Sequence, residues 1–296
     1  MIFSPFHTKH MRKKFIIFLI FIAPAMMFYL IELYCILDAI LMSFHRWTVL
    51  SPPKYVGLKN FIKLLDDEYV HNAAMNTLKW MVVSLIASVT VPILIALLLN
   101  CKLRGETLYK VVFILPQALS GVAVGVAWTW MFSPGFGVIN ETLRALGLKF
   151  LIRSWIGDPS TALYACVAGS IWVSTGFYTM IYLTRLRDIP QDLLEAARVD
   201  GASPWQVFIY VTLPLMREAF AIVTTLTILS SFKAFDIVLT MTRGGPQHAS
   251  EVLGLRIYIE GFELFRMGYA STISTALLLL SLVFVILYLR LILRRR

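Results

Sequence analysis

The feature that most limits the fold of this chain is a series of six long apolar runs. A helix needs about 20 apolar residues to cross roughly 30 Å of hydrocarbon, and each run reaches that length. The runs lie at Phe15–Phe44, Thr77–Leu99, Tyr109–Phe132, Ala162–Thr184, Ala219–Thr242 and Tyr269–Ile292. A transmembrane barrel would show alternating segments of roughly ten residues instead. The chain is therefore predicted to be an all-α integral membrane protein, with six transmembrane helices forming one domain over residues 1–296.

Composition and charge agree with a membrane location. Apolar residues make up 58% of the chain and charged residues 15%, which is outside the usual balance of soluble domains. The formal net charge is +10, but the basic residues form no stripe and no nucleic-acid-binding motif. We therefore attribute the charge to membrane topology and to attraction for anionic lipid, and expect no nucleic-acid partner.

The positions of Lys and Arg predict the orientation. With a cytoplasmic N-terminus, 15 of these residues lie in inner segments and 11 in outer loops, and the inner ones crowd the ends of the spans. The positive-inside rule then assigns both termini and the polar loop 185–217 to the cytoplasm. Arg12-Lys13-Lys14 before an apolar run resembles a signal peptide, but the apolar stretch continues to Leu41, so we predict an uncleaved first span.

The polar loop 185–217 contains signals for two short helices. Leu193–Val199 has no helix breaker, and Asp192 lies at its start, where a carboxylate meets the positive helix end. Gly201 should end this helix, and Ser203 followed by Pro204 is a typical start for the next one. Two short helices joined by a glycine bend predict a protrusion to which a soluble partner can bind. We call this protrusion of the loop 185–217 the knob.

This loop resembles the EAA loop of permease subunits in binding-protein-dependent ABC importers. The family pattern is Glu-Ala-Ala, three residues, Gly, nine residues and then Ile-x-Leu-Pro. The chain matches it at Glu195, Ala196, Ala197, Gly201, Leu213 and Pro214, with Val211 in place of Ile. The resemblance implies that these matched residues, together with Asp200, couple the permease to an ATPase.

Other segments resemble the carbohydrate branch of these permeases, in the same order along the chain. They are Val56-Gly-Leu-x-Asn-Phe61, Asn76-Thr77, Gly137-x-Ile-Asn140 and Thr242-x-Gly-Gly-Pro246. The resemblance implies a type I ABC importer permease fold in a bacterial cytoplasmic (inner) membrane. It also implies three kinds of partner: a second homologous permease, two ATPase subunits and an extracytoplasmic solute-binding protein.

The chain itself carries no sign of ATP chemistry. It lacks the Gly-x-x-x-x-Gly-Lys-Ser/Thr phosphate loop, and its five histidines do not cluster. No catalytic residue, metal site or bound cofactor is therefore expected here, and ATP and Mg are expected in the partner ATPase subunits.

Polar residues within the fourth and fifth apolar runs predict a substrate pathway. Hydroxyl groups can bond sugar hydroxyls, and aromatic rings can stack on the apolar face of a pyranose. The predicted pathway residues are Ser174, Phe177, Tyr178, Thr227, Ser230, Ser231, Lys233 and Asp236. The resemblance to maltose-type permeases implies substrate contacts at Val173, Ser174, Phe177, Thr227, Ser230, Ser231 and Ala234. A single Ser or Thr in such a helix can equally serve an internal helix bond.

Lys233 and Asp236 allow two interpretations. Both fall deep in the fifth apolar run, where a charged side chain costs roughly 2.5–3.5 kcal/mol, so neither should face lipid. They either pair with each other at i,i+3 on one helix face or line a solvated pathway. In the second case a lysine beside the pathway favours an anionic sugar, such as a uronate oligosaccharide like alginate.

Two other classes of function fit the sequence less well. A secondary transporter without an ATPase predicts inverted repeats and broken helices around an ion site, and the sequence shows neither. A membrane scaffold without transport leaves Lys233, Asp236 and the EAA-like loop unexplained. Gly121-x-x-x-Gly125 predicts tight helix packing, and Asn140 is expected to cap a short outer helix that ends at Gly147.

Overall fold

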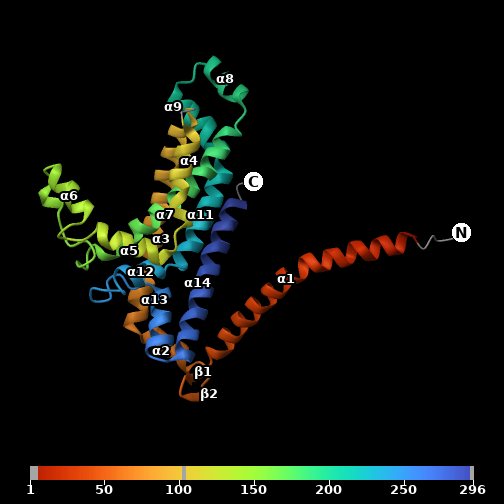
Figure 1. Ribbon diagram of the computed structural model, residues 1–296, viewed down its shortest axis with the longest axis vertical. Helices are drawn as coiled ribbons and strands as arrows, with labels where there is room; N and C mark the ends of the chain where they lie inside the picture. The colour runs from red at the N-terminus through yellow and green to blue at the C-terminus, as the bar shows by residue number, and fades with distance from the viewer. Residues whose placement is uncertain (1–5, 102–104, 294–296) are drawn as a thin grey trace.

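The computed structural model describes residues 6–101 and 105–293, and most of them are helical (Figure 1). The α-helices are α1 (Phe6–Met42), α2 (Lys59–Asp66), α3 (Glu68–Asn100), α4 (Glu106–Ile114), α5 (Gly121–Met131), α6 (Val138–Ala145), α7 (Ala162–Arg187), α8 (Gln191–Val199), α9 (Pro204–Val207), α10 (Leu213–Leu215), α11 (Arg217–Phe232), α12 (Asp236–Met241), α13 (Leu253–Tyr258) and α14 (Met267–Leu293). Short 3₁₀ segments occur at Leu115–Ala118 and Lys149–Leu151, and π segments at Phe208–Thr212 and Ile259–Glu263.

Four of the six predicted spans are single helices. In α1, residues Ile20–Met42 are long and apolar enough to cross a membrane, as are α3, α7 and the Met267–Tyr288 part of α14. Helix α3 starts ahead of its predicted apolar run because Asp67 caps it, accepting the N–H groups of Tyr69 and Val70. Helices α3, α7 and α11 pack against one another and form the centre of the bundle.

The third and fifth predicted spans are broken, which corrects the expectation of unbroken helices. The third consists of Glu106–Ala118 and Gly121–Met131, with axes that meet at 104°. The fifth consists of Pro204–Leu215 and Arg217–Phe232, bent by 63°, so it begins and ends earlier than the predicted Ala219–Thr242. Pro116 and Pro214 lie just before the two bends, and proline weakens the helical ladder because it has no N–H.

The two broken spans meet through the Gly121 and Gly125 pair. A Cβ on Gly121 would lie 2.7 Å from Cβ of Asp236, and one on Gly125 would lie 2.7 Å from Cβ of Thr240. Helices α5 and α12 therefore approach more closely than any larger residue would allow. The predicted small-residue packing face is confirmed, and its partner is the short helix α12.

One end of the molecule carries a small sheet that the sequence analysis did not predict. Strands β1 (His45–Thr48) and β2 (Ser51–Tyr55) pair antiparallel, with His45 opposite Tyr55 and Thr48 opposite Ser51. The hairpin base is held by Asn60, whose side-chain N–H groups donate to the carbonyls of Ser43 and His45, both at 3.0 Å. We call this the hairpin end of the molecule.

Buried charges tie α13 and the following π segment together near the hairpin end. Arg256 is almost fully buried and contacts the carboxylates of Glu251 and Glu260, which are also buried. The Arg256 guanidinium lies 4.8 Å from the centre of the Tyr69 ring, and Arg266 reaches Glu260 at 3.5 Å. Each buried charge thus has a counter-charge, as burial of ionised groups requires.

The expected role of Asn140 is wrong. Helix α6 is capped by Gly137, and Asn140 lies within it as a buried residue. Its side chain donates to the carbonyl of Arg153 at 3.1 Å and accepts the indole N–H of Trp155 at 2.8 Å. Asn140 therefore fastens α6 to the segment that follows it.

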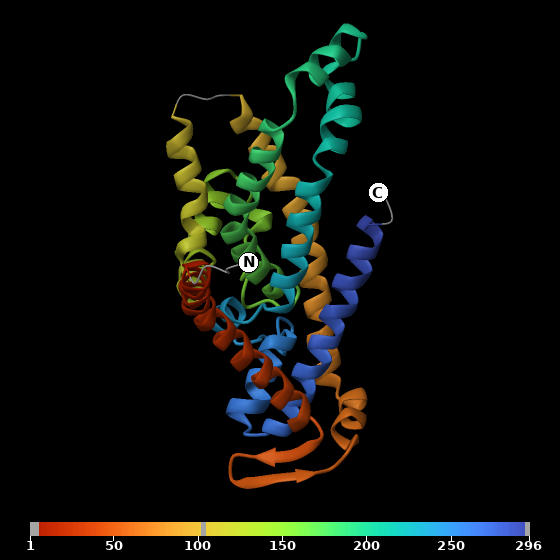
Figure 2. The same ribbon diagram turned by 90° about the vertical axis from the view of Figure 1, so that its right-hand side faces the viewer.

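The two ends of the bundle are far apart, and one helix stands away from it. Helix α8 lies at the end opposite the hairpin, which we call the α8 end (Figures 1 and 2). Helix α1 leaves the bundle near the hairpin and runs away from it (Figure 1). Its contacts are with α14 and β1, and its residues 20–37 are exposed.

Candidate functional site

The knob predicted between the fourth and fifth spans is present. Helix α8 ends at Val199, and Gly201 follows with φ +85°, a left-handed conformation that favours glycine. The N–H groups of Asp200 and Gly201 donate to carbonyls of the last helical turn. Helix α9 then starts at Pro204 with a capping box, in which Ser203 and Gln206 exchange backbone-to-side-chain bonds.

The knob presents exposed charged and apolar side chains. Glu195, Ala196 and Asp200 are exposed, Ala197 is half-buried, and Leu213 and Pro214 are exposed at the far end of the loop. Three exposed apolar residues add to them, although sequence reasoning did not single them out: Val199 at 86% exposure, Tyr210 at 75% and Trp205 at 69%. Large apolar side chains gathered on a polar loop are typical of a protein interaction surface.

A second candidate site is a pocket lined by hydroxyl groups between α3, α7 and α11. The cavity between these helices is small, about 10 Å³, which is room for roughly one water molecule. Its lining residues are Ser84, Ser88, Ser170, Ile171, Ser174, Thr175, Tyr178, Thr227 and Ser230. Four predicted pathway residues, Ser174, Tyr178, Thr227 and Ser230, are therefore brought together from two helices.

Most of these hydroxyls already donate a hydrogen bond to a backbone carbonyl of their own helix. Ser174 Oγ donates to the carbonyl of Ser170 at 3.1 Å, Thr227 Oγ1 to that of Val223 at 2.8 Å, and Ser230 Oγ to that of Thr227 at 3.0 Å. Their oxygens keep lone pairs free, so the pocket is rich in acceptors. Ser84 Oγ is buried and has no hydrogen-bond partner among the described residues. The chemistry of the pocket walls, rather than the present size of the cavity, therefore suits a ligand that carries several O–H donors.

Four predicted pathway residues lie outside this pocket lining. Phe177 is 39% exposed, with its ring 6.1 Å from that of Tyr178. Ser231 is buried and donates to the carbonyl of Thr227 at 2.7 Å. Lys233 and Asp236 lie beyond the end of α11, where Lys233 is the residue after the last helical turn and Asp236 begins α12.

Of the two interpretations of Lys233 and Asp236, the pair on one helix face does not hold, because α11 ends at Phe232 and α12 begins at Asp236. Among the ion pairs found over residues 6–101 and 105–293, none joins these two side chains. Both residues are exposed. Asp236 instead lies in the first turn of α12, where a carboxylate meets the positive helix end, and packs against Gly121.

Sequence reasoning missed the contribution of α3 to the pocket. Ser84 and Ser88 are four residues apart and therefore lie on one helix face, as do Ser170 and Ser174 on α7. That four-residue spacing is visible in the sequence and could have predicted that α3 contributes to the pocket. Which faces meet, however, depends on how the three helices pack.

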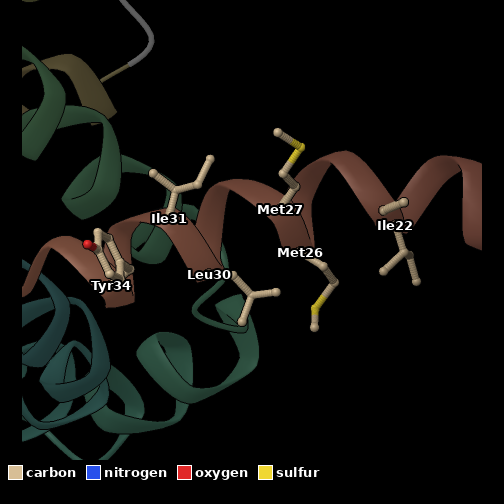
Figure 3. Close-up of a pocket in the computed structure, with 7 residues that line it drawn as sticks. Ile22, Met26, Met27, Leu30, Ile31 and Tyr34 are labelled. Carbon is tan, nitrogen blue, oxygen red and sulfur yellow. The ribbon is translucent and has the colours of Figure 1, made fainter. Parts of the chain in front are cut away.

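A further concave surface belongs to α1 alone. It is lined by Ile22, Ala23, Met26, Met27, Leu30, Ile31 and Tyr34 (Figure 3). Since no second element closes it, it cannot enclose a ligand. Its apolar side chains suit lipid or another helix, and it is separate from the hydroxyl pocket.

These features define a class of protein. Six apolar spans, two of them broken, together with a hydroxyl-lined pocket and an exposed knob at one end, are typical of a multi-pass membrane transport subunit. Residues 88–296 match the model of the family described as binding-protein-dependent transport system inner membrane component, and the chain belongs to that family.

Individual relatives agree with this family. The probable ABC transporter permease protein YurN of Bacillus subtilis (strain 168) is 34% identical over 266 residues, which cover 89% of this chain and 91% of that protein. The trehalose/maltose transport system permease protein MalF of Thermococcus litoralis is 31% identical, covering 84% and 83% of the two chains.

A solved structure shares the fold over nearly the whole length. It is a bacterial alginate ABC transporter in complex with an alginate pentasaccharide-bound periplasmic protein. The match has a TM-score of 0.79 and 25% identity, and covers 95% of this chain and 94% of that chain. The protein is thus a permease of an ABC transporter with the importer permease fold. A secondary transporter is not favoured, although two spans are broken.

Proposed function

We propose that this permease moves a sugar or oligosaccharide across a bacterial inner membrane, from an extracytoplasmic binding protein into the cytoplasm. The observation that carries the proposal is the acceptor-rich hydroxyl pocket between α3, α7 and α11. Sugars present many O–H donors, which fit acceptor oxygens. Relatives named for trehalose/maltose and for alginate transport support the same substrate class.

The pocket suggests that this chain does not hold an oligosaccharide alone. Its volume of about 10 Å³ is far below the range of roughly 300–1,000 Å³ for sites that enclose drug-sized ligands, so the helices would have to move apart to admit a sugar. A second homologous permease would complete the passage. Two ATPase subunits, which would hold ATP and Mg, would supply energy through Glu195, Ala196, Ala197, Asp200, Gly201, Leu213 and Pro214 on the knob.

The orientation forms part of this proposal. The knob and both termini are assigned to the cytoplasm, since an ATPase that uses cellular ATP must meet α8 there. The hairpin end would then face the binding protein. The bias of Lys and Arg toward the proposed inner side supports this assignment.

The proposal is tested by purifying the intact complex and measuring its ATPase activity with binding protein and a panel of sugars. We expect one class of sugar to stimulate hydrolysis at least several-fold. Glu195→Lys should abolish stimulation without lowering the membrane yield of the permease. Glu141→Lys makes the same charge reversal on the exposed helix α6 and should leave stimulation unchanged. Absence of stimulation by every sugar would contradict the proposal.

The charge of the sugar is a further part of the proposal. Lys233 lies just beyond α11, the helix that carries Thr227 and Ser230, and is exposed. If it attracts a uronate, Lys233→Met should lower uptake of acidic oligosaccharides and spare neutral ones. The double change with Asp236→Leu should show the same loss. Full uptake of acidic sugar by either variant would contradict the proposal of an anionic substrate. It would not contradict the proposal that the protein is a sugar permease.

A further inference from the structure

The bend in the fifth span joins the knob to the helix that lines the pocket. Helix α10 ends at Leu215, α11 begins at Arg217, and the two parts of the span meet at 63°. The π segment Phe208–Thr212 and Pro214 both loosen the backbone ladder just before this point. Met216, at the corner, is fully buried in a cluster that includes Tyr182. A loosened ladder around a buried corner has the form of a hinge.

One side chain from α7 spans this hinge. Arg185 Nε donates to the carbonyl oxygen of Leu215 at 3.1 Å, on the α10 side. Arg185 Nη2 lies 3.4 Å from the Glu218 carboxylate, in the first turn of α11 on the other side. The rigid fork of a guanidinium can hold two acceptors at a fixed separation, which a lysine ammonium cannot do in the same way.

Arg187 provides a comparison within the same helical turn. Its Nη1 lies 2.8 Å from the Glu106 carboxylate of α4, and its Nη2 donates to the carbonyl of Leu99 at 3.4 Å. Both arginines place a positive charge at the C-terminal end of α7, where it is favourable. The contacts of Arg187 fasten α7 to α3 and α4, whereas those of Arg185 cross the bend in the fifth span.

We infer that Arg185 is a positioning residue that sets the angle between the knob and α11, and so transmits movement of the knob to the pocket. The inference rests on the proposed function, because the ATPases supply the movement. The Arg185 and Glu218 side chains are 34% and 52% exposed. Exposed pairs of this kind are weak, so the contact can break and re-form in each transport cycle.

Two measurements on the complete complex test the inference. The first is the amount of sugar imported per ATP hydrolysed in proteoliposomes. The second is the distance distribution between spin labels at Val199→Cys and Ile222→Cys, with the native Cys35, Cys101 and Cys166 changed to Ser. Val199 is 86% exposed on α8 and Ile222 is 51% exposed on α11, so the labels report the angle across the hinge.

Arg185→Gln should lower sugar imported per ATP by about three- to tenfold, in line with loss of one exposed pair and one hydrogen bond, while hydrolysis continues. The distribution of distances between the two spin labels should become broader. Glu218→Gln should give a smaller loss, since the bond to the Leu215 carbonyl remains. Arg187→Gln, the matched control, removes the same charge from the end of α7 and should change neither readout.

Several results would overturn the inference. Equal effects of Arg185→Gln and Arg187→Gln would mean that only the charge at the end of α7 matters, and full coupling in Arg185→Lys would mean the same. If the Arg185→Gln complex fails to assemble, Glu218→Gln provides the test. An unchanged distance distribution between the labels in Glu218→Gln would then overturn the inference. Failure of the proposed function is recognised separately, because the unmodified complex would then show no sugar-stimulated hydrolysis.

Discussion

At the scale of single residues, the Ser84 hydroxyl is the clearest candidate for a ligand contact. It is buried, lines the pocket and has no hydrogen-bond partner among the described residues. A buried polar group without a partner costs free energy, so its retention is explained if a ligand supplies the partner.

Ser84→Ala should therefore lower sugar uptake by about tenfold while leaving the free energy of unfolding unchanged or higher by up to about 1 kcal/mol. The checks are an uptake assay and thermal unfolding of the purified complex. Ser281→Ala is the control, because Ser281 donates to the carbonyl of Leu278 on α14, away from the pocket. Wild-type uptake in Ser84→Ala would mean that the hydroxyl does not contact the sugar.

Asp67 makes a residue-scale prediction about pH. Burial alone would raise the pKa of this carboxyl, but hydrogen bonds from the Tyr269 hydroxyl and the Val70 N–H outweigh it, and the pKa lies below its ordinary value of 3.8. A lowered pKa in the folded state stabilises the fold above the unfolded pKa. That contribution is lost as the pH falls through the folded value.

Asp67→Asn keeps the helix cap but removes the charge. The unfolding free energy of the native protein should exceed that of this variant by about 1 kcal/mol at pH 7, and the difference should shrink as the pH falls below 3.8 and vanish once the pH is below the lowered pKa of the folded state. Thermal unfolding across this range measures it. Asp66→Asn, next to it and exposed, is the control. A gap between native protein and Asp67→Asn that does not change with pH would contradict the assignment.

At the scale of helices, local signals were predictive and long-range ones were not. Gly201, Ser203 and Pro204 act on the backbone beside them, so the two helices of the knob were predicted from the sequence. The breaks in spans three and five were missed because proline alone does not mark a break: Pro116 and Pro214 lie near the two bends, but Pro24 and Pro92 lie inside the unbroken helices α1 and α3. Arg256 and Glu260 are four residues apart, a spacing that the sequence shows, but their burial depends on how α13 packs against α3, which no nearby pattern encodes.

The contact between α5 and α12 leads to a prediction at this scale. Gly125→Ala should lower the unfolding free energy by about 1–3 kcal/mol, because the added methyl would lie 2.7 Å from Thr240 Cβ. Gly135→Ala is the matched control, since a Cβ there meets nothing within 4 Å. Thermal unfolding compares the two. Equal stability of both variants would show that the two helices can separate without cost.

At the scale of the whole molecule, the distance between the α8 end and the hairpin end makes orientation testable. In a cysteine-free background, Trp205→Cys should react with a membrane-impermeant thiol reagent only once the cytoplasmic side is opened. Ala145→Cys should react from outside in intact spheroplasts. Both positions are exposed. The reverse pattern would overturn the proposed orientation and the proposed ATPase contact together.

The separation of α1 from the bundle bears on how the protein is made. Residues 20–37 of α1 are exposed, and α1 leaves the ribosome before the helices that form the bundle. Its passage from the translocon into lipid must therefore depend on its own mean hydropathy of 2.1 rather than on later spans. We therefore expect biogenesis in two stages, in which α1 enters the bilayer on its own and α3, α7 and α11 then assemble around one another.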